Sequence, residues 1–153
     1  HLRFSTTLSS LQLYGCPLHP AITQLPELKE VALHWLEGNC EDLPGGPWLK
    51  NLLHLDIMDA NLTSIEAVLR QATRLNRLRI EQCPYLQFRR HELPLLLEMP
   101  LRWLMIDKRP ERIKDDMVPI WNEDSLWVAA ELEKALETRG SSVSFDICTE
   151  QFC

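Results

Sequence analysis

An apolar pattern that recurs five times constrains the fold of this chain more than any other feature. Apolar residues stand at positions 1, 4, 6, 9 and 11 of three good copies, which begin at Leu8, Leu52 and Leu75. Weaker copies begin at Leu28 and Leu101, so the successive steps are 20, 24, 23 and 26 residues. Repeats of this length predict small supersecondary units that bury their apolar faces by stacking on one another.

The spacing within each copy predicts a short strand. Positions 4 and 6 are two residues apart, so their side chains point to the same face, while positions 3, 5 and 7 point to the other. Leu11 and Leu13 occupy positions 4 and 6 in the first copy, and Leu78 and Ile80 occupy them in the fourth. Stacked copies are therefore expected to form a parallel sheet with one packed face and one free face.

These residues resemble the leucine-rich-repeat family, whose pattern is LxxLxLxx(N/C)xL, over about residues 8–108. The resemblance implies an α/β solenoid, a curved horseshoe with a parallel sheet on its concave face and short helices and loops on its convex face. Cys16-Pro17 and Cys83-Pro84 look like the cysteine-type repeats of intracellular F-box substrate receptors and plant immune receptors. In the family the residue at position 9 hydrogen-bonds the turn, a role expected here for buried thiols of Cys16 and Cys83.

The repeats are expected to occupy residues 1–108, with a truncated repeat before the first full one, and residues 109–153 to form a C-terminal cap. The cap should contain a polar loop, a helix that is N-capped by Asp124 and runs to about Thr138, and a last strand around Phe145 beside the fifth strand.

The connecting segments should return along the convex side. Thr63-Ser64-Ile65-Glu66 is typical of a capping box before a helix that ends between Arg70 and Thr73. Glu92–Met99 predicts a short helix limited by prolines, and Gly38–Pro47 predicts a loop.

Charge and cysteine content narrow the classes of partner. The formal net charge is −6, from 22 acidic and 16 basic residues, which disfavours nucleic acid and anionic membrane surfaces. Five cysteines without a CxxC pair argue against a disulfide framework or zinc site. Cys148 and Cys153 leave two alternatives, a local disulfide or reduced thiols, and reduced thiols in a cytoplasmic protein are the expectation.

Positions 3, 5 and 7 define the candidate partner-binding residues on the concave face. They carry residue types that are enriched in protein interfaces, alongside polar residues that solenoids commonly leave in solvent. The predicted set is Tyr14, His34, His54, Asp56, Met58, Arg77, Arg79, Glu81, Trp103 and Met105. Asp56 and Arg79 share position 5 of adjacent copies, so they should be able to form an ion pair of about 0–1 kcal/mol.

Enzyme motifs do not assemble in this sequence. His34 and His54 lie at opposite ends of neighbouring strands, roughly 13 Å apart, so they should not share a metal ion. His91-Glu92 begins like HExxH, but residue 95 is Leu, so that motif's second histidine is absent. Gly45-Gly46 is not followed by the Lys-Ser/Thr of a phosphate loop, and GxSxG is absent. No catalytic residue, cofactor or metal is expected.

The sequence therefore predicts a non-catalytic module that binds another protein, with the Lys108–Asn122 loop as a second candidate surface. Two alternatives stay open: the substrate-recognition part of an F-box ubiquitin ligase, and a structural subunit of a large assembly. A plant-type immune sensor would need further domains. Trp48, Trp121 and Trp127 are expected to plug the edges of the solenoid, whereas an exposed Trp121 would favour the loop as an interaction site.

Overall fold

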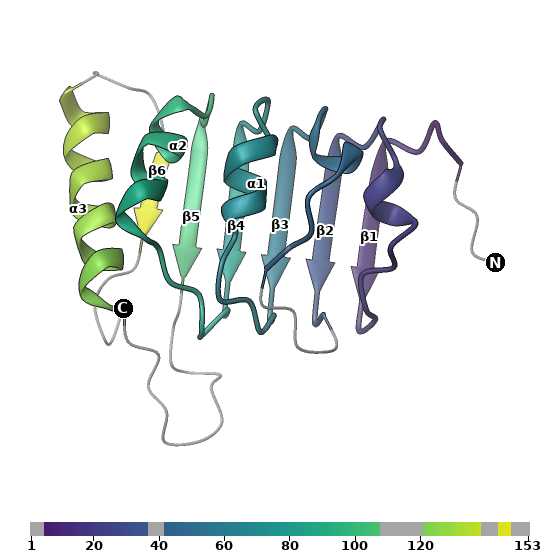
Figure 1. Cartoon of the computed structure of the whole chain (residues 1–153), viewed down its shortest axis with the longest axis horizontal. Helices are drawn as coiled ribbons and strands as arrows, with labels where there is room; N and C mark the ends of the chain where they lie inside the picture. The colour runs from purple at the N-terminus through teal and green to yellow at the C-terminus, as the bar shows by residue number, and fades with distance from the viewer. Residues whose placement is uncertain (1–4, 37–41, 108–120, 139–143, 148–153) are drawn as a thin grey trace.

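Six parallel strands form one sheet, in the order in which they occur in the chain (Figure 1). The computed structural model describes residues 5–36, 42–107, 121–138 and 144–147. The strands are β1 (Ser10–Tyr14), β2 (Glu30–His34), β3 (His54–Met58), β4 (Arg77–Glu81), β5 (Trp103–Asp107) and β6 (Ser144–Ile147). Parallel strands joined by helical segments confirm the α/β class and the parallel sheet.

The strands are aligned at the predicted repeat positions. Leu11 lies opposite Val31, Val31 opposite Leu55, Leu55 opposite Leu78, and Leu78 opposite Leu104. A slip of one residue would turn every apolar side chain of a strand to the other face, so burial of positions 4 and 6 fixes this register. The predicted last strand is also confirmed, because β6 pairs in parallel with β5.

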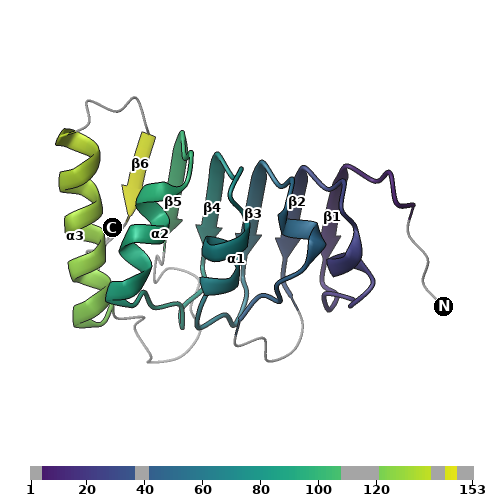
Figure 2. The same ribbon diagram turned by 45° about the horizontal axis from the view of Figure 1, so that its top comes forward.

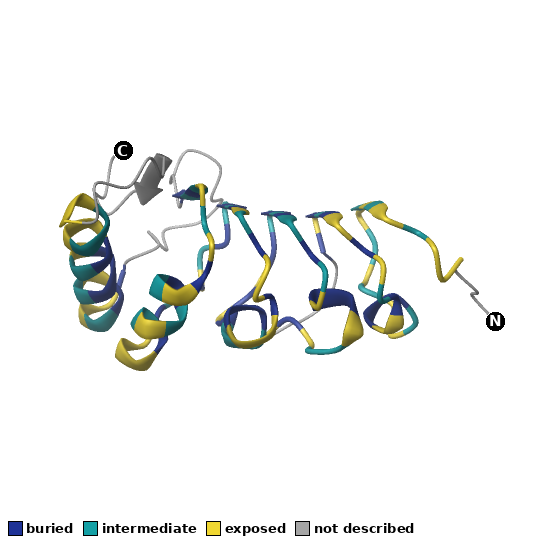
Figure 3. Cartoon of the chain, turned by 90° about the horizontal axis from the view of Figure 1, so that it is seen from above, coloured by how far each residue is buried: buried dark blue, intermediate teal, exposed yellow. Residues whose placement is uncertain are grey.

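Short helical segments cover one face of the sheet (Figures 2 and 3). They are the 3₁₀ helices η1 (Ile22–Gln24), η2 (Pro47–Leu49) and η3 (Arg90–Glu92), and the α-helices α1 (Glu66–Gln71) and α2 (Leu93–Glu98). The longer α3 (Glu123–Thr138) packs against α2 and η3. The predicted N-cap at Asp124 is wrong, because Asp124 lies in the first turn and the Asn122 side chain accepts the Ser125 N–H at 2.8 Å. The other face of the sheet, which carries positions 3, 5 and 7, is called the open face below.

One hydrophobic core lies between the sheet and these segments. Leu33, Ile57 and Leu78 are completely buried, and Val128 and Leu132 of α3 belong to the same core. The segment predicted as a cap therefore shares its core with the repeats. Leu11 and Leu13 of β1 are only half-buried, since β1 pairs with a neighbour on one side alone within the described residues.

The same turn follows each of the first four strands. Gly15, Trp35, Asp59 and Gln82 all have left-handed backbone, with φ of 60°, 55°, 55° and 55°. Each of them donates its backbone N–H to the carbonyl of the last residue of the next strand, at 2.8–3.1 Å. Left-handed backbone costs a residue other than glycine about 1–2 kcal/mol, so the repeated bond to the neighbouring strand holds three of these turns against that cost.

The predicted capping box is wrong. Helix α1 begins at Glu66, after an N-cap at Ile65 that makes no side-chain capping bond. Ser64 and Ile65 are buried in the core, so the helix starts later than the motif implies. The Ser64 hydroxyl accepts the Glu66 N–H at 3.1 Å, while the Glu66 carboxylate turns toward neighbouring cationic side chains. The predicted helix at Glu92–Met99 is confirmed as η3 followed by α2.

The two position-9 cysteines differ. Cys83 is buried, and its thiol donates to the Glu81 carbonyl across 3.6 Å, as expected. Cys16 is only half-buried, so the prediction of a buried thiol is wrong there. Cys16 follows β1, which is an edge strand of the described sheet, so a neighbouring repeat covers it on one side only.

The tryptophans outside the strands are largely internal. Trp48 is fully buried, Trp121 is 7% exposed and stacks on Phe88 with ring centroids 5.9 Å apart, and Trp127 is half-buried beneath Arg90. An exposed Trp121 would have favoured the Lys108–Asn122 loop as a second interaction site. Trp121 is buried, so that condition is not met.

Some predictions fall outside the described residues. They are those for residues 1–4, the 37–41 part of the loop, most of the polar loop at 108–120, Val143, and the two cysteines in 148–153. In the ranges that are described, no helix has both the length and the apolar character that a bilayer crossing requires.

Candidate protein-binding face

The open face brings together all ten predicted partner-binding residues. They belong to β1–β5 and alternate with the apolar residues of those strands that face the core. Tyr14 and Arg77 are exposed, whereas the other eight are half-buried by their neighbours. The strands therefore present a continuous surface in which most side chains are already packed against one another.

An ion-pair cluster occupies the middle of this face. Arg79 donates to the Glu81 carboxylate from Nε at 3.1 Å and from Nη2 at 2.7 Å. The predicted pair with Asp56 is present but looser, with 3.8 Å between Nη1 and Oδ2. The hydrogen bond to Glu81 raises the pKa of Arg79 above its ordinary value. Arg79 is thus held chiefly by a residue of its own strand, so less of its charge is available to a partner.

The two histidines of the face have separate acidic neighbours. His34 Nε2 lies 3.8 Å from Asp56 Oδ2, and His54 Nδ1 lies 3.4 Å from Glu30 Oε1. The strand register places His34 opposite Met58 and His54 opposite Glu30, at opposite ends of β2 and β3. They do not converge on a shared position. Among the described residues, His34 Nε2 and Asp56 Oδ1 have no hydrogen-bond partner.

The face is hollowed over its first four strands. The hollow has a volume of about 430 Å³ and is lined chiefly by polar side chains, among them Gln12, Glu30, His54, Asp56 and Arg77. On its far side the guanidinium of Arg77 lies over the ring of Trp103, 4.5 Å from the ring centroid. A cation held on an aromatic face in this way keeps both side chains in a defined position.

An exposed aromatic cluster lies at the carboxyl ends of β1 and β2. Tyr14 is 53% exposed and Trp35 is 55% exposed. Tyr14 packs edge-on against His34 at 4.9 Å and lies 6.2 Å from the Trp35 ring, centroid to centroid. The indole N–H of Trp35 donates to Asp59 Oδ2 at 2.7 Å, which fixes the orientation of the ring. These four residues are called the aromatic cluster below.

Sequence reasoning missed Trp35. It stands at position 8, just after the strand, which the strand alternation does not assign to either face. The signal was nevertheless present, because a tryptophan fills the repeat position that other copies fill with Gly15, Asp59 and Gln82. A large apolar side chain on a left-handed turn is an unusual choice for solubility alone.

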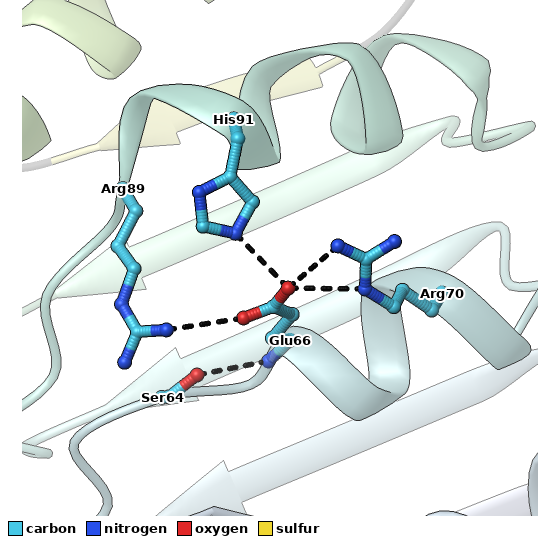
Figure 4. A network of polar contacts seen from close by, with 5 residues as sticks. All are labelled: Ser64, Glu66, Arg70, Arg89 and His91. Carbon is cyan, nitrogen blue, oxygen red and sulfur yellow. Dashed lines mark hydrogen bonds and ion pairs between the residues drawn. The ribbon is translucent and has the colours of Figure 1, made fainter.

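A second polar cluster lies on the helical side of the sheet (Figure 4). Glu66 Oε1 accepts from Arg70 Nη2 at 2.7 Å and lies 3.0 Å from His91 Nε2, while Glu66 Oε2 accepts from Arg89 Nη1 at 3.2 Å. These bonds, first that from Arg70 and then that from His91, lower the pKa of Glu66.

Glu92 lies beside this cluster and is fully buried. Within the described residues neither of its carboxylate oxygens has a hydrogen-bond partner. Burial, followed by repulsion from Glu66, raises the pKa of Glu92 to about 7. Ligand atoms of Glu66, His91 and Glu92 all lie within 4.8 Å of one another. The structure thus supplies a neighbour for the His91-Glu92 pair that the sequence motif lacked.

Comparison with known proteins returns no match to a protein-family model, a curated protein or a solved structure.

Proposed function

We propose that this chain is a leucine-rich-repeat solenoid and a non-catalytic module that binds a protein partner through its open face. Three observations support the solenoid. Consecutive strands stack in parallel at the same repeat positions, the same left-handed turn follows β1 to β4, and short helical segments return on one side of the sheet. This is how units that cannot bury their apolar faces alone achieve a shared core.

The observation that carries the binding function is the aromatic cluster. Two large aromatic side chains are more than half exposed, adjacent, and held in place by His34 and Asp59. Tyrosine and tryptophan are enriched among the residues that dominate binding energy, and aromatic rings held in advance lose little entropy on binding.

The charges around the cluster favour a partner segment with a cationic side chain next to an apolar one. The Asp56 side chain is 31% exposed, and its Oδ2 is only loosely paired, 3.8 Å from both His34 Nε2 and Arg79 Nη1. Asp59 lies against the Trp35 indole. The chain as a whole carries a formal charge of −6. An arginine could stack on Tyr14 or Trp35 while its guanidinium faces these carboxylates, a geometry that combines cation–π attraction with charge pairing.

Selection from a library of random displayed peptides tests this proposal even though the natural partner is unidentified. Peptides that bind the immobilised chain should be enriched in arginine or lysine beside apolar residues. Their capture should weaken with rising salt, because charge pairing contributes to it. The matched bait is an Asp56→Asn variant, which keeps the shape of the side chain and removes its charge.

Two results would count against the proposal. One is a selection that enriches no common sequence, and the other is enrichment of acidic peptides whose capture is unchanged by Asp56→Asn. Circular dichroism of the variant must match the wild type, so that lost capture reports the surface rather than misfolding.

A further inference from the structure

We propose that Glu66, His91 and Glu92 form a binding site for a divalent transition-metal ion of the zinc type. The site lies on the helical side of the sheet, and the inference does not depend on partner binding by the open face. Glu66 comes from the first turn of α1, and the other two residues come from η3. One imidazole nitrogen and two carboxylates, each offering one ligand atom, meet within 4.8 Å.

The separations suit a shared ion. Ligand atoms about 2.0–2.2 Å from a metal are about 3–4.4 Å from one another. His91 Nε2 and Glu66 Oε1 are 3.0 Å apart, the separation of adjacent ligands in such a sphere. All three ligand atoms lie within 4.8 Å of one another, so a small inward movement of one side chain would bring them to the separations of a single coordination sphere.

Glu92 supplies the second, independent indication of a ligand. A carboxylate removed from water normally has hydrogen-bond donors around it, since an unpaired buried charge is strongly destabilising. Glu92 is fully buried, and in the described part of the chain neither of its oxygens receives a hydrogen bond. A bound cation would give this carboxylate the partner it lacks.

Two arginines compete with the ion for Glu66. Arg70 occupies Oε1 through Nε and Nη2, whereas Arg89 occupies Oε2. Both arginine side chains are more than half exposed, so Arg70 can swing into solvent. Arg89 can stay, because a hydrogen bond to the second oxygen of a ligating carboxylate is a common outer contact in metal sites.

The ligand set indicates the class of metal. Imidazole nitrogen favours zinc and its transition-metal neighbours over magnesium and calcium, which prefer oxygen ligands alone. With three protein ligands, at least one coordination position remains for water or another group. Because the ligands come from consecutive repeats, a bound ion would join α1 to η3 and stabilise that contact.

The test measures Zn²⁺ affinity by calorimetry and Co²⁺ binding by absorption, using the full chain in metal-depleted buffer. Wild type should bind one ion without the thiolate charge-transfer absorption that a cysteine site would give. Glu92→Gln, which keeps the side-chain volume, should weaken binding at least about ten-fold. Arg70→Gln should instead tighten binding, since it removes a competitor for Glu66.

Matched controls are Glu133→Gln on the exposed face of α3 and His19→Gln in an exposed loop, and both should bind as wild type does. The proposal is overturned by wild type that binds no ion, by affinity that survives Glu92→Gln, or by a Co²⁺ complex with thiolate absorption. Circular dichroism distinguishes a variant that has lost metal binding from one that has lost its fold. Glu92→Gln should stay folded, because it replaces a buried carboxylate by a neutral amide of similar volume.

Discussion

Replacing Trp48 by alanine is expected to lower the free energy of unfolding by about 3–5 kcal/mol, a large share of the total stability of a domain. Trp48 is completely buried, and its side chain is the largest of the fully buried ones in the described residues. Its indole N–H donates to the Pro44 carbonyl at 2.9 Å. Alanine would leave a cavity beneath the sheet and an unpaired carbonyl. Urea unfolding followed by far-UV circular dichroism measures the change.

Two variants make this result interpretable. Trp48→Phe keeps most of the apolar volume and loses the hydrogen bond, so it should cost distinctly less than alanine. Trp35→Ala removes an exposed tryptophan and should cost about 1 kcal/mol or less. If Trp48→Ala proved no more damaging than Trp35→Ala, Trp48 would not be part of the core as described.

The second large effect concerns binding. The double substitution Tyr14→Ala and Trp35→Ala should weaken capture of selected peptides at least about thirty-fold, equivalent to about 2 kcal/mol. Both rings are more than half exposed in the free chain, so the change removes contact area without opening the core. Fluorescence anisotropy with a labelled peptide gives the dissociation constants.

The matched control for that experiment is Tyr85→Ala. Tyr85 is 48% exposed, close to the exposure of Tyr14, but it lies beyond β4 in the segment that leads to η3. Its loss should leave affinity unchanged. Equal losses in the control and in the double variant would show that binding follows general apolar exposure rather than the aromatic cluster.

Much of the fold could be predicted because it depends on burial alone. The alternation at Leu11, Val31 and Leu55 fixes which face of each strand is packed, and parallel stacking then fixes the register. The apolar stripe that contains Val128 and Leu132 predicted α3 in the same way. In both cases the local pattern and the shared core require the same arrangement.

The remaining features depend on how neighbouring repeats meet side by side. Glu66 and His91 are 25 residues apart, which is about one repeat length, so stacking of the repeats brings them together. The strand pattern does not predict how the helical segments of neighbouring repeats are offset from one another, so this contact could not be predicted. Thr63-Ser64-Ile65-Glu66 was expected to form a capping box, yet burial of Ser64 and Ile65 delays the start of α1 to Glu66. Trp35 was missed because its position is a turn rather than a strand.

Hydroxyl-radical footprinting of a peptide complex tests most directly whether the open face is the binding surface. Oxidation of exposed aromatic and sulfur-containing side chains would be compared with and without a bound peptide, using Tyr85 as the internal reference. Binding through the open face predicts that Tyr14 and Trp35 become protected while Tyr85 reacts as before. Protection of Tyr85 with unchanged oxidation of Tyr14 and Trp35 would contradict it and would place the binding surface at the segment between β4 and η3.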